Sequence, residues 1–377
     1  MKTRALIMGS FTAVFFLMVL FPLWGWVFPQ PVYDSLDEKR LLTEWDQTGS
    51  LKDRIANAEA YLSDHLSFRN TAIDVTLRTD LALGESPSEM VLAGTDGWLF
   101  YVEGEEDFRR GTGLDEDRIR EFYDVHQKLT DAFAAMGIDY HVMIAPDKHS
   151  VYPQYLPLTR RLGSGPWELK QLLVPPGPGY TVRMIDVSDA LLDAASSGVK
   201  QYFKTDSHWN HEGGWTAYQA IMDRLIPDHP DMRRLTEDDV VRTDIDVSGD
   251  LASLIGQKGI IADTTAMVKP KESHCSHTSD ANSLIVESFR NSALPDAPKL
   301  LMVCDSFRTA MLPFLSESVS ELDVVMNDTP SLAAIDDLSH YDIVLFEAVE
   351  RNRYWLWGGI DGVCRDSEEE YEEEPDP

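Results

Sequence analysis

Ser306 combines a nucleophilic hydroxyl with a position that favours chemistry. It follows the apolar run 299–304 almost directly and opens a segment that reads as helical through Leu315. In open α/β sheets, sites lie beyond the carboxyl ends of the strands, and a helix N-terminus offers free N–H groups that can stabilise an oxyanion. The alternative is an ordinary helix cap, since Asp-Ser is a common helix start. Ser306 alone therefore indicates either a nucleophile or a cap.

A second polar cluster supplies the groups that a serine nucleophile needs. Asp206, His208, His211 and Glu212 lie within seven residues of sequence. A serine needs a general base, and a carboxylate holds that base in the productive tautomer. In an extended or turn segment, Asp206 and His208 can project to one side and serve as acid and base. Two alternatives stay open: a metal site from His208, His211 and Asp206, although the spacing matches no strong zinc signature, or a polar loop with a capping Asp.

Alternating helical and apolar segments predict the elements that must position these residues. Apolar residues recur at helical spacing over 115–136, Gly137 ends that helix, and 140–145 reads as a strand. Further strands are expected at 182–187, 299–304, 322–326 and 342–346, and further helices within 37–83 and at 188–195, 212–225, 306–315 and 331–338. This alternation is typical of a doubly wound, parallel α/β sheet. The segment 236–296 has poor apolar periodicity, which predicts an irregular insertion.

The N-terminal segment predicts a membrane anchor. Lys2 and Arg4 precede an almost continuous apolar run, 5–28, which is about as long as a helix that crosses a bilayer. Trp24 and Trp26 lie at its far end, where indoles favour the interface, and the leading cations predict a cytoplasmic N-terminus. The alternative is a cleaved secretory signal, which the length of the run and the lack of a small-x-small cleavage site disfavour. Either interpretation exports the rest of the chain.

The acidic composition excludes one class of partner. The chain holds 33 Lys and Arg against 64 Asp and Glu, a formal net charge of −31, and the excess is not confined to the C-terminal tail. A surface this negative repels nucleic acid, so nucleic-acid binding is discarded. Cysteine use fits an exported chain: Cys304 lies in an apolar run, and Cys275 with Cys364 could form one disulfide.

Several motifs resemble, in one consistent order, those of the AlgJ/AlgX group of bacterial exopolysaccharide O-acetyltransferases, also called DHHW proteins. Asp-Ser-His-Trp at 206–209 is similar to the family's Asp-x-His-Trp motif, and Val-Cys-Asp-Ser-Phe at 303–307 is similar to the block around its nucleophile. Further similar segments lie at 64–70, 94–101, 145–153, 249–252 and 346–351. Each motif is weak alone, but six or more in order are specific.

The resemblance implies an SGNH-hydrolase-like α/β domain with a permuted catalytic order, preceded by one N-terminal transmembrane helix. By this carry-over Ser306 is the nucleophile, His208 the general base and Asp206 the orienting acid. Cys304 stands where the family's block usually has glycine. Candidate substrate-binding residues, each with a structural role as the alternative, are Arg308, Lys148, Arg351, Glu347 and Trp209.

The expected domains follow from these observations. Residues 1–33 form the cytoplasmic N-terminus and signal-anchor, and 34–83 form a helical stalk or N-terminal layer. Residues 84–360 form the SGNH-like acyltransferase domain, with the irregular insertion at 236–296, and 361–377 form an acidic, disordered tail. The anchor places the catalytic domain in the periplasm, at the inner membrane.

The expected activity is transfer of an acetyl group, through a serine acyl-enzyme, to hydroxyls of an exopolysaccharide. The resemblance also implies a membrane-bound acyltransferase as the acyl donor, a polysaccharide acceptor, and neither a metal nor an organic cofactor. Alginate is one acceptor considered, and a neutral or differently charged polymer is equally open. Two alternatives remain: an extracytoplasmic carbohydrate esterase with the same three residues, and a non-catalytic polysaccharide-binding or assembly protein.

Overall fold

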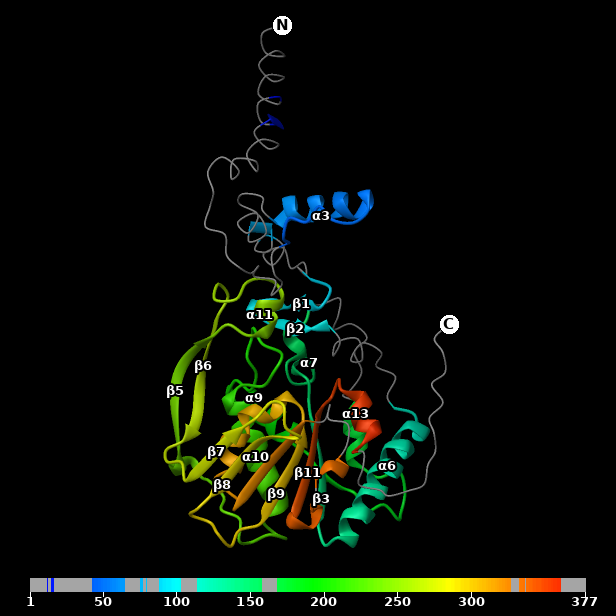
Figure 1. Ribbon diagram of the computed structural model, residues 1–377. Helices are drawn as coiled ribbons and strands as arrows, with labels where there is room; N and C mark the ends of the chain where they lie inside the picture. Colours follow the sequence, from blue (N-terminus) through cyan, green and yellow to red (C-terminus); the bar gives the residue numbers. More distant parts are fainter. Residues whose placement is uncertain are drawn as a thin grey trace.

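The computed structural model describes residues 43–64, 88–102, 114–157, 168–326, 332–335 and 337–360, with a few single positions before residue 80 (Figure 1). The predicted signal-anchor lies almost wholly outside this part, as does the predicted acidic tail. In the segments that are described, every helix is too short or too polar to cross a bilayer. The anchor, the domain bounds and the tail therefore stay predictions.

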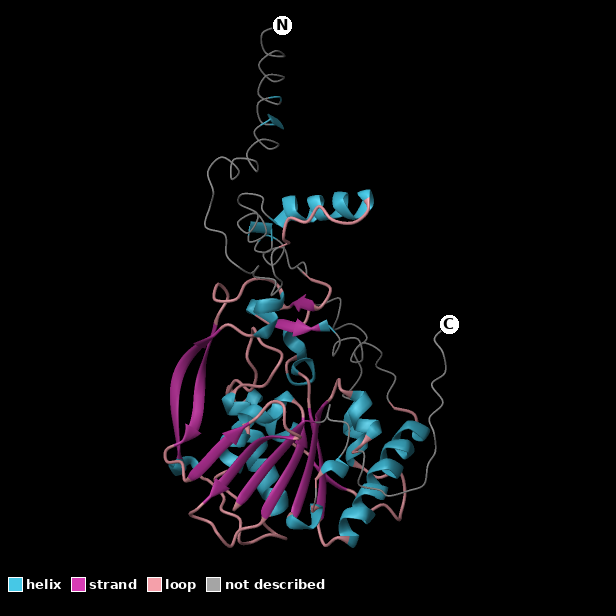
Figure 2. Cartoon of the chain, in the orientation of Figure 1, coloured by secondary structure: helices cyan, strands magenta, loops and turns pink. Residues whose placement is uncertain are grey.

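A seven-stranded sheet forms the centre of the molecule (Figure 2). Its strands lie in the order β4-β3-β11-β9-β10-β8-β7; the first five run parallel, and β8 and β7 continue the sheet antiparallel. Their bounds are β3 Asp139–Ala145, β4 Arg183–Ile185, β7 Cys275–Ser279, β8 Ile285–Asn291, β9 Lys299–Cys304, β10 Glu321–Met326 and β11 Ile343–Val349. The predicted α/β class is confirmed, although the sheet is mixed rather than wholly parallel.

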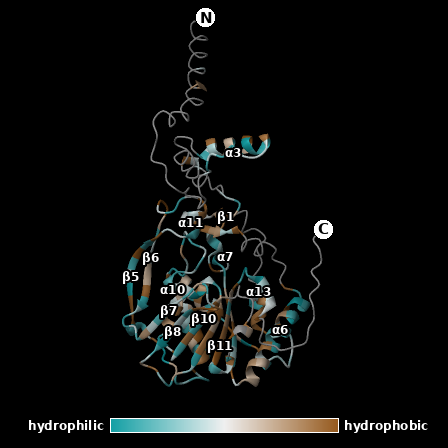
Figure 3. Ribbon diagram, viewed as in Figure 1, coloured by the Kyte–Doolittle hydropathy of each residue, from teal (hydrophilic) through white to brown (hydrophobic). Residues whose placement is uncertain are grey.

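Both faces of the sheet are covered, which explains why its central strands are apolar throughout (Figure 3). Successive side chains of a strand point to opposite faces. Thus Leu300, Met302 and Cys304 pack with α9 (Ser188–Ser196) and α10 (His211–Leu225), whereas Leu301 and Val303 pack with α6 (Glu116–Ala135) and α13 (Arg353–Gly358).

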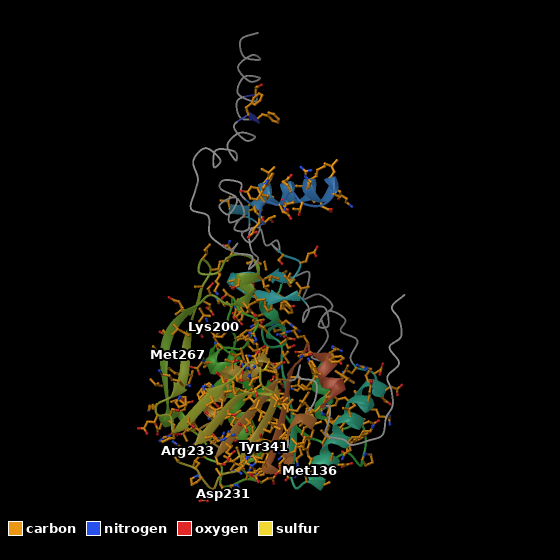
Figure 4. The ribbon with its side chains drawn as sticks, viewed as in Figure 1. Met136, Lys200, Asp231, Arg233, Met267 and Tyr341 are labelled. Atoms are coloured by element: carbon orange, nitrogen blue, oxygen red, sulfur yellow. The ribbon has the colours of Figure 1, made fainter. Side chains whose placement is uncertain are left out.

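Both ends of helix α6 lie where the sequence predicts them. Asp115 caps its start by accepting a hydrogen bond from the Arg118 N–H at 2.8 Å. Gly137 follows with φ of 80°, a left-handed conformation that glycine adopts without strain. Figure 4 places Met136 and Tyr341 at the lower end of the sheet, where β3 and β11 begin, and Lys200 towards the opposite end.

The prediction of an irregular segment at 236–296 is wrong. Strands β5 (Val240–Val247) and β6 (Asp263–Pro270) form an antiparallel ribbon, with the short helix α11 (Asp250–Leu254) between them. Strands β7 and β8 add to the main sheet. The strands escaped detection because β5 is mostly exposed and β7, Cys-Ser-His-Thr-Ser, is almost wholly polar.

The remaining elements are short. In the described part of the segment 331–338, the expected helix is replaced by the 3-10 turn η6 (Leu332–Ala334) and the first residue of η7 (Leu338–His340). Outside the sheet domain, α3 (Leu51–Asp64) lies apart from the strands (Figure 1). The other elements are η1 Thr95–Gly97, α7 Lys148–Val151, η2 Pro153–Tyr155, η3 Glu168–Leu173, η4 Glu237–Asp239, η5 Ser306–Ala310, α12 Leu312–Leu315, η6 Leu332–Ala334, η7 Leu338–His340, and the ribbon of β1 Val91–Ala93 with β2 Leu99–Tyr101.

Candidate active site

The turn that carries Ser306 follows β9 at the carboxyl edge of the sheet. Asp305 fixes this turn: its carboxylate accepts hydrogen bonds from the Phe307 N–H at 2.9 Å and the Val349 N–H at 2.7 Å. The turn continues as the 3-10 helix η5, on which the Ser306 side chain is exposed. The sequence thus places Ser306 at the edge where open α/β sheets build their sites, with its hydroxyl accessible.

A backbone bridge and a buried lysine fix the loop that carries Asp206 and His208. Tyr202 and Trp209 pair as an antiparallel bridge, so residues 203–208 form a tight loop between them. The Lys148 Nζ donates to three backbone carbonyls of this loop, those of residues 203, 204 and 206, at 3.0, 3.2 and 2.6 Å. The loop is therefore fixed independently of any substrate.

Glycines allow the surrounding segments to approach this loop. A Cβ on Gly249 would lie 2.3 Å from the Cβ of Asp206. A Cβ on Gly214, at the start of α10, would lie 2.4 Å from the carbonyl oxygen of Ala310, at the end of η5. Both distances are well below ordinary contact, so the meeting of loop, helix and serine turn depends on glycine at these positions.

Ser306, His208 and Asp206 meet in a continuous chain of hydrogen bonds. The Ser306 Oγ lies 2.7 Å from the His208 Nε2, and the His208 Nδ1 lies 2.7 Å from an Asp206 carboxylate oxygen. A carboxylate can only accept, so Nδ1 carries the proton and Nε2 is free to accept from the serine. This is the tautomer in which a histidine can remove a serine proton.

Asp206 is held in its ionised form. Burial opposes ionisation, but hydrogen bonds from the His208 ring, the His208 N–H and the Asp250 N–H outweigh it and lower the pKa of Asp206 to about 2. Next to the serine, no described residue accepts a hydrogen bond from the Ser306 N–H. The geometry thus brings together the groups that acyl transfer through a serine requires: a carboxylate, an imidazole, a hydroxyl and an N–H that can donate to an oxyanion.

Three predicted substrate contacts are contradicted by burial. Lys148 is 3% exposed, and burial lowers its pKa to about 7 while its ammonium binds the loop carbonyls. Glu347 is 0% exposed and accepts from the Asp305 N–H at 3.2 Å, and burial raises its pKa well above the ordinary value. Trp209 is 1% exposed and donates its Nε1–H to the Phe307 carbonyl at 2.8 Å. All three bind backbone groups of the loop or of the serine turn and so hold the site in place.

Arg308 and Arg351 lie beside the serine turn with part of each side chain accessible. Arg308 donates to Glu287 and to the Asp305 carbonyl, each at 3.1 Å. Arg351 is paired with Asp147, and its guanidinium lies 5.3 Å from the centre of the Phe307 ring. Their role as substrate contacts stays a prediction. Cys304 stands where the family's motif usually has glycine, and its side chain packs wholly within the core.

Sequence reasoning missed Asp250, whose N–H donates to Asp206 at 2.9 Å. The Gly-Asp pair at 249–250 was the available signal, but nothing in the sequence states that it meets a loop more than forty residues away.

Two clusters in the described part bring three possible metal ligands within 4.8 Å of one another: Asp206, His208 and Asp250; and Asp147, His149 and Glu350. The first is the hydrogen-bonded loop itself, and His211 of the alternative metal interpretation is not part of it. In the second, Glu350 already accepts from the Asp147 N–H and the Ser150 hydroxyl, at 2.8 and 2.6 Å.

A serine, histidine and aspartate at the edge of a doubly covered α/β sheet define an SGNH hydrolase-like domain. The family described as "SGNH hydrolase-like domain, acetyltransferase AlgX" matches residues 91–318, more than half of the chain and a range that includes all three residues. The chain therefore belongs to the AlgX family, which confirms the resemblance.

Two solved structures of PatB1 share the fold of this chain. PatB1 of Bacillus cereus is 16% identical, with a TM-score of 0.52, over 71% of this chain and 97% of that one. Its form with a sulfonyl adduct gives the same identity and TM-score over 70% and 94%. The O-acetyltransferase domain of Pseudomonas putida AlgJ is 17% identical, with a TM-score of 0.45, over 72% and 93%. A search of curated proteins gives no match.

Proposed function

We propose that this chain is an O-acetyltransferase that moves an acetyl group, through an acyl-enzyme on Ser306, to hydroxyls of an exopolysaccharide. Membership of a family of acetyltransferases supports the reaction class. The observation that carries the proposal is the pair of 2.7 Å contacts that join Ser306 to His208 and His208 to Asp206, with the serine exposed.

In the first step the Ser306 Oγ attacks the carbonyl carbon of the acetyl donor, and its proton passes to the His208 Nε2. Asp206 stabilises the imidazolium that forms, and the Ser306 N–H stabilises the oxyanion. The oxyanion collapses, the bond to the donor's leaving oxygen breaks, and that oxygen takes the proton from His208. An acetyl ester on Ser306 remains.

In the second step a sugar hydroxyl attacks this ester while His208 removes its proton. The second oxyanion collapses with cleavage of the bond to Ser306, and the imidazolium returns its proton to the serine oxygen. The acetylated sugar leaves, and the enzyme is restored. If water replaced the sugar, the same steps would release acetate.

We place this reaction in the periplasm, with the domain held at the inner membrane by the apolar segment 5–28 and supplied with acetyl groups by a membrane-bound acyltransferase. The sequence of the segment and its leading cations support the anchor. Protease accessibility in spheroplasts tests the orientation: the C-terminal domain should be cleaved from outside while the inner membrane is intact.

Incubation with an activated acetyl ester, with and without neutral and uronic oligosaccharides, tests the function. Intact-protein mass spectrometry should detect one acetyl group on the wild type and none on Ser306→Ala. Acetylated sugar should appear with the wild type and not with Ser306→Ala. Ser276→Ala, on an exposed strand, is the matched control. Acetate without acetylated sugar would identify an esterase, and the absence of any adduct would favour a non-catalytic binding protein.

A further inference from the structure

Asp250, the first residue of α11, contacts the loop that carries Asp206 and His208, on the side of the imidazole opposite Ser306. Its N–H donates to the Asp206 Oδ2 at 2.9 Å, and its own carboxylate accepts from the N–H and the hydroxyl of Ser207, at 2.7 and 2.5 Å. The Asp250 Oδ2 also lies 3.7 Å from the His208 Nδ1. Two carboxylates therefore face the same ring nitrogen.

We propose that Asp250 is a positioning residue that acts as a second carboxylate for His208, which rests on the proposed acyl transfer. It holds the imidazole in place through Ser207, stabilises the imidazolium electrostatically, and takes over the Nδ1–H when Asp206 is lost.

The acceptors around the Nδ1–H form a graded set. Asp206 Oδ1 is nearest at 2.7 Å, the Ser207 Oγ follows at 3.3 Å, and Asp250 Oδ2 lies at 3.7 Å. The Ser207 hydroxyl donates its hydrogen bond to the Asp250 carboxylate, so its oxygen lone pairs remain free to accept from the imidazole N–H. Both further acceptors thus lie within 1 Å of the distance of the first.

The contact between α11 and the loop is rigid because each of the two segments donates hydrogen bonds to the other. Besides the contacts of Asp250, the Gly249 N–H donates to the Thr205 hydroxyl and the Ala252 N–H to the Thr205 carbonyl, each at 3.1 Å. Gly249 allows this approach, since a Cβ there would collide with Asp206. The Asp250 carboxylate cannot drift from the ring without breaking this set.

The charged groups at the imidazole and next to it come from several elements. Asp206 shares its loop, Asp250 comes from α11, and Asp305 of the serine turn also interacts with the ring. Lys148 interacts with both Asp206 and Asp250, and Arg351, from the segment after β11, interacts with Asp250 and Asp305. The Asp250 side chain is 38% exposed, so water screens part of its charge. Its removal should therefore change the protonation equilibrium of the base moderately.

The first measurement is the pH profile of kcat/KM for acetyl-ester turnover. Asp250→Asn should lower kcat about tenfold and move the acidic limb to lower pH by roughly half a unit to one unit, because the loss of a carboxylate disfavours the imidazolium. Asp250→Ser, which keeps a short polar side chain at the helix start, should move the limb in the same direction. Asp244→Asn, an exposed aspartate on β5, should leave rate and limb unchanged. A lower rate with an unmoved limb in both Asp250 variants would overturn the proposal.

The second measurement is a double-mutant cycle. Loss of the triad carboxylate in a serine protease costs about 10⁴ in kcat. With Asp250 in reserve, Asp206→Asn should lose only about 10²-fold, and Asp206→Asn with Asp250→Asn should lose about 10⁴-fold. If the single Asp206 variant is already as slow as the double variant, Asp250 gives no support. Failure of the acyl-transfer proposal is distinguished by the wild type forming no adduct, or by Ser306→Ala retaining activity.

Discussion

Replacement of Lys148 by methionine should separate loop positioning from overall stability. The ammonium of Lys148 binds three carbonyls of the loop that carries Asp206. Methionine keeps most of the buried chain but leaves the carbonyls of Phe203 and Asp206 without this donor. The Lys204 carbonyl still accepts from the Leu99 N–H at 2.8 Å. If the lysine is a positioning residue, the loop should lose its geometry while the fold persists.

The two opposing terms in the free energy of unfolding are similar in size. Leaving two part-buried carbonyls unpaired costs roughly 2–6 kcal/mol, at about 1–3 kcal/mol each. Burial holds the pKa of Lys148 at about 7 instead of 10.5, which corresponds to roughly 5 kcal/mol spent on keeping the cation buried at pH 6. Methionine removes that cost, so the net change should be within about 3 kcal/mol.

Activity should respond far more strongly. A displacement of about 1 Å in a reacting group can cost about 10²-fold in rate, and the loop that orients His208 loses its support from below. We expect kcat for acetyl-ester turnover to fall at least about 10²-fold with KM little changed. Lys271→Met is the matched control, because this exposed lysine also donates to one backbone carbonyl, that of Asp238. A kcat within threefold of the wild type would refute the positioning role. A rise in KM with kcat unchanged would also refute it and would indicate that Lys148 contacts the substrate directly.

Three further predictions follow from contacts near the site. Gly249→Ala should lower both the melting temperature and kcat, because its Cβ would lie 2.3 Å from that of Asp206; an unchanged kcat would mean that the loop tolerates displacement. Trp209→Phe should destabilise the protein by about 1–3 kcal/mol in urea unfolding, because it removes the buried hydrogen bond to the Phe307 carbonyl and part of a buried ring system, and should leave KM for the sugar unchanged; a large rise in KM would indicate that Trp209 stacks on the sugar. Glu350→Gln should gain stability relative to the wild type as pH rises: burial, and next Asp147, raise the pKa of Glu350 from 4.5 to about 8, so its contribution is present below pH 4.5 and is lost between there and about pH 8. Parallel urea titrations at several pH values measure this difference, and a constant difference would contradict the raised pKa.

The sequence predicted best where a chain segment is buried on both sides. The run 299–304 is found as β9 with the same bounds, because a central parallel strand must be apolar along its whole length. Strand β7 was missed for the opposite reason: it lies at the edge of the sheet with most of its side chains exposed, so its sequence carries no apolar pattern.

Charge misled the assignment of Lys148 because a lysine is almost always exposed. Its burial depends on three carbonyls contributed by a loop more than fifty residues away, and no local pattern records their presence. Asp250 was overlooked in the same way, since its partners Asp206 and Ser207 are separated from it by more than forty residues. Motif similarity pointed to Ser306, His208 and Asp206, whereas only the fold identified the residues that hold them.

The way in which the loop of His208 is supported leaves the order of the three residues along the chain unconstrained. This loop does not continue a strand of the main sheet; it is closed by the bridge of Tyr202 with Trp209 and tied to neighbouring segments by Lys148 and Asp250. Because these ties are tertiary, the loop can precede or follow the serine in sequence without changing the geometry that proton transfer requires. The chemistry therefore constrains which groups meet and at what distance, and leaves their order free.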